Sequence, residues 1–174
     1  MAGSGSLTLR RVGDGDVAFL AELYADEDVR PWLAASRRYD AGGIRAQLGR
    51  HEAKPDAGGL LVVELDGTPA GAMAWERVNE RSRIAQLGGL AIHPSFRGRR
   101  IADEAARLLQ RHLLLDLGFH RLQLEIYGFN ERAQRHAERA GFVREGVKRK
   151  AYLRDGDWVD SVMYGLVEDD LSEP

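Results

Sequence analysis

The chain has 174 residues, of which 44% are apolar and 30% are charged, a balance typical of one globular domain with a buried core. Its 25 basic and 27 acidic residues give a formal net charge of −2, which excludes a global attraction to nucleic acid or to a membrane surface. There is no cysteine, so disulfides, thiolate zinc sites and a cysteine nucleophile are excluded, and we expect no metal centre.

The two ends of the chain differ in composition from the rest. The first six residues are small and polar, without the basic and apolar regions of a signal peptide, and they predict a flexible tail. No apolar run approaches the ~20 residues that a membrane-spanning helix needs. We therefore expect a cytoplasmic protein with no membrane partner, a single domain over residues 7–167 and an acidic, frayed C-terminal tail over 168–174.

The first third of the chain predicts a strand followed by two helices. Residues 7–12 alternate between apolar and polar, as in a half-buried strand. Val17, Leu20 and Tyr24 recur at helical spacing and predict a short amphipathic helix. A second helix is expected over 41–52, ended by the glycine pair at 58–59.

Three strands and a longer helix should follow. The apolar run 60–65 predicts a buried strand, and Asp66-Gly67 is a hairpin turn that leads to a returning strand at 69–76. The later elements are expected, in chain order, as a strand at 84–93, a helix from 101 to 117, a strand at 121–127, a helix at 132–140 and strands at 147–153 and 158–166. This order describes a mixed α/β or α+β domain with one central sheet.

The loop before the helix at residue 101 has the composition of an anion site. It contains Arg97, Gly98, Arg99 and Arg100 and runs directly into the helix that starts at Ile101. Unpaired N–H groups at a helix N-terminus favour an anion, and guanidinium groups suit phosphate. Glycine lets the backbone approach closely. A pyrophosphate site is one interpretation, and a solvated surface turn is the other.

The run LAIHPSFRGRRIADEAARLLQ resembles the acetyl-CoA motif of the GNAT superfamily of N-acetyltransferases. That motif reads Arg/Gln-x-x-Gly-x-Gly/Ala and falls here on Arg97, Arg100 and Ala102. Arg100 stands where the family usually has glycine. The departure concerns the conformation of the loop, because any residue there still supplies its backbone N–H.

Two further stretches resemble the same superfamily. Asn130 opens a segment similar to its Asn-x-x-Ala/Ser motif, in which the asparagine contacts the pantetheine or its waters, although Asn130 also suits a helix cap. Residues 140–166 are similar to the C-terminal end of the RimJ/RimL and spermidine-acetyltransferase-like branch, with Gly-Phe-x-x-Glu-Gly and Asp-x-x-x-Tyr-x-Leu. The resemblance covers about residues 7–167 and implies acetyl-CoA as co-substrate.

The resemblance also implies a fold and a set of cofactor contacts. The GNAT fold is α/β (α+β mixed), a central, mostly antiparallel, twisted sheet of about seven strands with a V-shaped splay, flanked by about four helices. The glycines at 88–89 could permit a bulge that opens the sheet. The expected cofactor-binding residues are Leu90, Ala91 and Ile92 along the pantetheine, then Arg97, Gly98, Arg99, Arg100, Ile101 and Ala102 at the diphosphate, and Asn130.

The catalytic residues depart from the commonest family pattern. In the family, an amine attacks the thioester directly, which requires a route for the ammonium proton and an acid for the thiolate. The usual acid tyrosine falls on Ala137, and the usual strand-four glutamate falls on Gln86. The remaining candidates are Tyr127 as acid, Gln86 to orient a water, the carboxylates Glu125 and Glu76, whose pKa burial would raise, and the histidines His93 and His136.

These observations favour an N-acetyltransferase that acts on a primary amine: a small-molecule amine, a polyamine, an amino acid or a protein N-terminus. A catalytically silent CoA-binding regulatory module is the alternative, because both usual catalytic residues are missing. Residues 132–154 carry eight basic and two acidic side chains, but they lack the interleaved aromatics of an RNA-stacking platform, so no nucleic-acid partner is expected. The resemblance allows a homodimer, which no pattern in the sequence supports.

Overall fold

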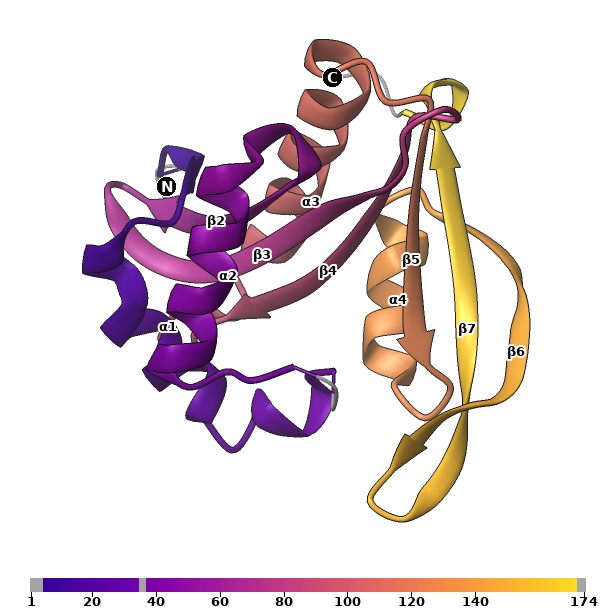
Figure 1. The fold of residues 1–174 in the computed structure, drawn as a ribbon, viewed down its shortest axis with the longest axis horizontal. Helices are drawn as coiled ribbons and strands as arrows, with labels where there is room; N and C mark the ends of the chain where they lie inside the picture. The colour runs from indigo at the N-terminus through magenta and orange to yellow at the C-terminus, as the bar shows by residue number, and fades with distance from the viewer. Residues whose placement is uncertain (1–4, 35–36, 172–174) are drawn as a thin grey trace. The chain divides into compact units, whose positions relative to one another are not determined.

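The computed structural model describes residues 5–34 and 37–171, so most of the tail predicted at 1–6 and the last three residues of the tail predicted at 168–174 lie outside it. Within that range the chain forms seven strands and four α-helices in the predicted order, and Figure 1 shows how most of them are arranged along the chain. The strands are β1 Leu7–Arg11, β2 Gly58–Leu65, β3 Thr68–Asn79, β4 Ile84–Ile92, β5 Arg121–Tyr127, β6 Val143–Arg154 and β7 Asp157–Val167. The helices are α1 Val17–Ala25, α2 Ala41–Ala53, α3 Ile101–Arg111 and α4 Glu131–Arg139.

The strands form one mixed sheet in the order β1-β2-β3-β4-β5-β7-β6, which confirms the predicted mostly antiparallel, seven-stranded fold. The start of β4 pairs with β5 in parallel, with Gln86 opposite Gln123. The chain divides into two compact units. The first runs to Glu76 and resumes over Gly89–Ala105, and the second comprises Arg77–Gly88 and the residues from Ala106 onward.

The first unit packs α1 and α2 with β2 and β3 around one apolar cluster. Leu20 and Leu23 of α1 and Ile44 of α2 are fully buried with Val62 of β2. Each such side chain contributes about 1.5–3 kcal/mol on leaving water, so the helical stripes read from the sequence account for this packing. The carboxylate of Asp40 caps α2 by accepting from the amide of Gly43 at 2.7 Å.

Two details of the first unit differ from the sequence expectation. Gly58 and Gly59 do not end α2, which stops at Ala53, but are the first residues of β2. A Cβ on Gly58 would lie 2.9 Å from both the His51 ring and the Trp75 carbonyl oxygen, so the glycine is required by this close approach. The turn between β2 and β3 is as expected, because Asp66 and Gly67 have φ of 52° and 75°, as a two-residue hairpin requires.

The second unit is built on the antiparallel pairs β5–β7 and β7–β6. Leu122, Tyr164 and Leu166 of these strands are buried, as are Leu109 of α3 and Phe142, which follows α4. Strand β6 is longer than predicted, because it begins at Val143 rather than near Val147. It also bulges between Lys148 and Tyr152, where the amide of Lys150 donates to the Asp160 carboxylate at 2.7 Å.

The chain after β7 continues into a short helix where it is described. Glu168–Asp170 form a 3-10 helix, and the Asp170 carboxylate accepts from the Val167 amide at 2.9 Å. These three residues thus form one helical turn, and the frayed tail expected over 168–174 stays a prediction. Among the helices of the described chain, none is long and apolar enough to cross a membrane.

Candidate functional site

The predicted anion loop lies at the surface of the first unit, between the end of β4 and the start of α3. A short 3-10 helix, Pro94–Phe96, follows β4, and Gly98, Arg99 and Arg100 are exposed. Gly98 has a φ of 79°, a conformation that glycine adopts without steric cost. The loop is therefore not buried, and its backbone can be reached by a ligand.

The start of α3 presents unpaired backbone donors. The first turn of α3 is closed by the amide of Glu104, which donates to the Arg100 carbonyl at 3.1 Å. The amides of Ile101 and Ala102 precede this bond and have no acceptor inside the helix. Together with the positive end of the helix dipole, they provide a place for an anion.

Arg100 stands where the family motif usually has glycine, and its backbone has a conformation that glycine tolerates best. Its φ is 57°, in the left-handed region that costs a residue with a Cβ about 1–2 kcal/mol. A side chain at this position therefore adds backbone strain and a guanidinium group to the turn. The side chains of Arg99 and Arg100 are exposed, with the Arg99 guanidinium 5.8 Å from the centre of the Phe96 ring.

The Arg97 side chain folds back onto the protein, and its predicted contact with the cofactor stays a prediction. Its Nε donates to the Ile92 carbonyl at 3.3 Å, and its Nη1 lies 3.1 Å from the carboxylate of Asp28. Only 25% of the Arg97 side chain is exposed. The guanidinium thus sits at the loop but is bound by the protein's own carboxylate.

The expected pantetheine strand, Leu90, Ala91 and Ile92, follows a distortion in β4. Gly89 has a φ of 65°, in the left-handed region that glycine adopts without steric cost, while the expected bulge that opens the sheet stays a prediction. Gly71 of β3 faces this segment: a Cβ there would collide with the Ala91 carbonyl oxygen and lie 2.8 Å from Ile92 Cδ1. Gly71 was not identified from the sequence, because a glycine inside a strand gives no sign of what approaches it.

Asn130 is buried in the second unit at the start of α4. Its side-chain oxygen accepts from the amide of Ala133 at 3.1 Å, so it acts as the helix cap that its residue type favours. A contact with the cofactor remains a prediction. Ala137, at the position of the usual family tyrosine, is 2% exposed on the same helix.

Glu125 of β5 lies in a hydrogen-bonded group that joins three strands. One carboxylate oxygen is 2.5 Å from Lys148 Nζ, and the other accepts from the hydroxyls of Tyr152 at 2.7 Å and Ser161 at 3.2 Å. Burial raises the pKa of Glu125, but these three donors outweigh it and hold the pKa below its ordinary value. The expected rise in the pKa is therefore wrong, and Glu125 is ionised at neutral pH.

The other catalytic candidate in the second unit is Tyr127. Its ring stacks on Phe129 with centroids 5.3 Å apart and an interplanar angle of 10°, and it meets Tyr152 edge-on at 6.1 Å. The guanidinium carbon of Arg154 lies 4.9 Å from the centre of the Tyr127 ring. Gln86 accepts a hydrogen bond from the side-chain amide of Gln123 at 2.9 Å, which fixes its orientation.

The remaining titratable candidates are Glu76, His93 and His136. The carboxylate of Glu76 pairs with Arg37 at 3.0 Å in the first unit. His93 accepts from the amide of Ser95 at 3.3 Å through Nδ1. His136 lies on α4. The catalytic assignments of all these residues remain predictions.

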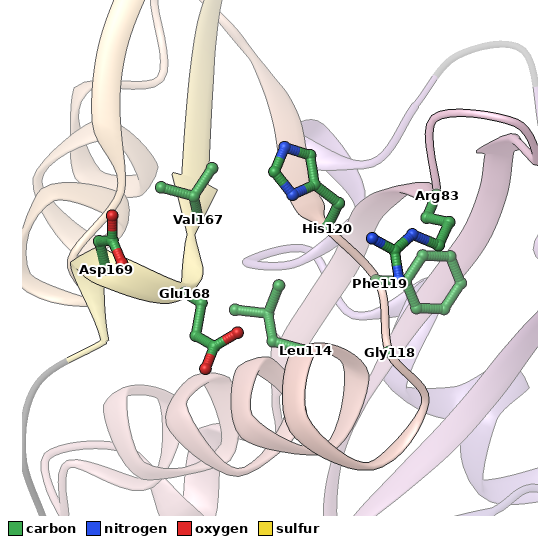
Figure 2. A pocket seen from close by; sticks show the side chains of 8 residues that line it. All are labelled: Arg83, Leu114, Gly118, Phe119, His120, Val167, Glu168 and Asp169. Atoms are coloured by element: carbon green, nitrogen blue, oxygen red, sulfur yellow. The ribbon is translucent and has the colours of Figure 1, made fainter.

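A separate pocket of about 340 Å³ lies in the second unit (Figure 2). In that view the carboxylates of Glu168 and Asp169 lie on the opposite side from the Arg83 guanidinium. The lining residues are Arg83, Leu114, Gly118, Phe119, His120, Val167, Glu168 and Asp169. The pocket shares no residue with the predicted cofactor or catalytic sets.

The chain matches a family model and several known proteins. The model of the "Acetyltransferase (GNAT) domain" matches residues 6–143, more than half of the chain. A curated relative from Bacillus subtilis (strain 168), the "SPbeta prophage-derived uncharacterized N-acetyltransferase YokL", is 28% identical over 166 residues, which span 95% of this chain and 92% of the relative. The [ribosomal protein uS5]-alanine N-acetyltransferase of Escherichia coli (strain K12) is 27% identical over 173 residues, covering 94% and 89%.

The likeness extends to solved structures. Spermidine N-acetyltransferase from Vibrio cholerae, in complex with CoA and spermine, matches with a TM-score of 0.84 at 20% identity, over 95% of this chain and 97% of the other. At 20% identity this likeness shows a shared fold, whereas the match to the family model is a match of the sequence. The chain therefore belongs to the GNAT acetyltransferases, a family of N-acetyltransferases that use acetyl-CoA.

Proposed function

We propose that the chain transfers the acetyl group of acetyl-CoA to a primary amine, and that the loop before α3 holds the diphosphate of the cofactor. The observation that carries this proposal is the exposed turn Gly98–Arg100, whose two left-handed residues open α3 with unpaired amides. A diphosphate at this turn would accept hydrogen bonds from those amides. Arg99 and Arg100 would add charge-assisted contacts.

The pantetheine arm is assigned to the segment Leu90–Ile92, through main-chain hydrogen bonds. A backbone N–H in this segment would polarise the thioester carbonyl and stabilise the oxyanion that forms when the amine attacks. The attack forms the C–N bond, and collapse of the tetrahedral intermediate breaks the C–S bond. The enzyme needs no covalent intermediate for this reaction, and the sequence contains no cysteine to form one.

Proton transfer is assigned to Tyr127 and to water oriented by Gln86. The amine must lose a proton to attack, and the thiolate must gain one to leave as a thiol. The hydroxyl of Tyr127 is proposed to donate its proton to the thiolate. Because Glu125 has a lowered pKa and three donors, it is poorly suited to take the ammonium proton at neutral pH. We therefore assign it to hold Lys148, Tyr152 and Ser161 in place.

We propose that the acceptor is a primary amine, which includes a small-molecule amine, a polyamine, an amino acid and a protein N-terminus. The names of two relatives describe an alanine of a ribosomal protein and spermidine, both of which are amine acceptors. The acidic residues Asp26, Glu27 and Asp28 would favour a cationic acceptor over an anionic one.

The test is release of free CoA from acetyl-CoA, followed with a thiol reagent, over a panel that contains spermidine, an amino acid and a peptide with N-terminal alanine. Because the protein has no cysteine, the reagent reports only the CoA thiol. We expect amine-dependent release and an acetylated amine by mass spectrometry. CoA binding without turnover across the panel would instead favour the silent CoA-binding module, and absence of CoA binding would reject both functions.

A further inference from the structure

We propose that Asp28 competes with the cofactor for Arg97: the carboxylate holds the guanidinium in the free protein and gives it up when a diphosphate binds. This inference rests on the proposed function, because it assumes that the loop before α3 is the diphosphate site. Asp28 lies between α1 and α2, and it is 69 residues from Arg97 in the sequence.

The contacts of Arg97 would let its guanidinium exchange the Asp28 carboxylate for a phosphate. The Nε donor is held by the Ile92 carbonyl at 3.3 Å, which anchors the side chain at the end of β4. The Nη1 donor faces Asp28 at 3.1 Å. A guanidinium has five N–H donors in a planar fork, so the group can keep its bond to Ile92 while its outer edge changes from a carboxylate to a phosphate.

Asp28 is also placed by its own backbone. Its amide donates to the Asp26 carboxylate at 2.9 Å, and the amide of Arg30 donates to the Asp26 carbonyl at 2.8 Å. The neighbouring Val29 is buried in the core of the first unit. The carboxylate is therefore presented to Arg97 by an anchored turn.

The competition should favour the diphosphate. The Asp28 side chain is 66% exposed, and an ion pair of this kind is weak because water and salt screen it. A diphosphate carries more charge and would meet the amides at the start of α3 at the same time. Removing the carboxylate should therefore tighten cofactor binding by an amount equal to the small free energy of the ion pair between Arg97 and Asp28.

The experiment is calorimetric titration of CoA into the full chain and its variants at low salt. Asp28→Asn should bind CoA about two- to fivefold more tightly than the unaltered chain, the range expected for loss of an exposed ion pair. Glu27→Gln is the matched control, because it removes the same charge from the neighbouring exposed residue. In an Arg97→Gln background, Asp28→Asn should leave the affinity unchanged.

The outcomes separate this inference from the proposed function. If Asp28→Asn weakens CoA binding, or has no larger effect than Glu27→Gln, the competition is rejected while the cofactor site stands. The same holds if Asp28→Asn has an equal effect with and without Arg97, because the effect is then general electrostatics. If the unaltered chain does not bind CoA, the proposed function fails and the inference fails with it.

Discussion

The amide of Glu104 donates to the carbonyl of Arg100 at 3.1 Å, so α3 opens on a residue that itself has a left-handed φ of 57°. Arg100→Gly should relieve this strain and raise the free energy of unfolding by about 0.5–1 kcal/mol, after the entropy that glycine loses on folding is included. Urea denaturation measures the change. Arg100→Ala is the control, since it removes the guanidinium but keeps the Cβ and should give no gain. A gain from both variants would show that the guanidinium, not the backbone, was destabilising.

The exposed guanidinium of Arg99 can be used to test whether the positive charge of the loop contributes to CoA binding. Arg99→Glu should weaken CoA binding about tenfold or more, because a contact between a charged donor and a phosphate is replaced by repulsion. Calorimetry of CoA binding measures the loss. Arg81→Glu makes the same charge change at an exposed arginine outside the loop and should have little effect. Equal losses in the two variants would mean that net charge, not the loop, governs affinity.

The elements that the sequence predicts well are those determined by residues close together in the chain. The turn at Asp66-Gly67 follows from two residues that tolerate positive φ, and α1 and α2 follow from their apolar spacing. The loop before α3 has an equally local pattern, because its donors come from consecutive residues at one helix start, and its role as an anion site stays a prediction. Its exposure agrees with both interpretations of the pattern, a pyrophosphate site and a solvated surface turn.

The contacts that the sequence does not predict join distant residues. The pair between Arg97 and Asp28 spans 69 positions, and each residue alone looks like a solvated surface charge. The donors around Glu125 lie 23 to 36 residues away on two other strands. The bulge in β6 that accompanies this arrangement follows from no pattern of residue types. A pKa that depends on such donors therefore cannot be assigned its direction from burial alone.

Gly71 should be required for the shape of β4. Gly71→Ala places a Cβ against the Ala91 carbonyl and Ile92, so we expect a loss of about 1–3 kcal/mol in the free energy of unfolding. Because this segment is the proposed pantetheine strand, CoA affinity should also fall. Gly88→Ala is the control, since a Cβ there meets no atom within 4 Å. Equal stability of the two variants would show that β3 and β4 adjust without cost.

Glu125→Gln should change how stability depends on pH. The folded pKa of Glu125 lies below its ordinary value of 4.5, so the ionised carboxylate stabilises the fold above that pH and the contribution is lost as the pH falls through the folded pKa. The variant should be about 1 kcal/mol less stable at neutral pH, and the difference should shrink in acid. Urea denaturation at several pH values measures it. Glu131→Gln, in an exposed pair with Arg135, should show little change at any pH.

Tyr127→Phe tests the assignment of the acid. The variant keeps the ring that stacks on Phe129 and faces Arg154, so only the hydroxyl is lost. If that hydroxyl protonates the thiolate, kcat should fall by about a hundredfold or more while the Kd for CoA stays the same.

Tyr152→Phe is the matched control for this test. Its hydroxyl donates to Glu125, which with burial raises the pKa of Tyr152 to about 12 and makes it a poor acid. Its loss should therefore affect stability more than kcat. A Tyr127→Phe enzyme with unchanged kcat would reject the assignment, and the thiolate would then have to take its proton from water.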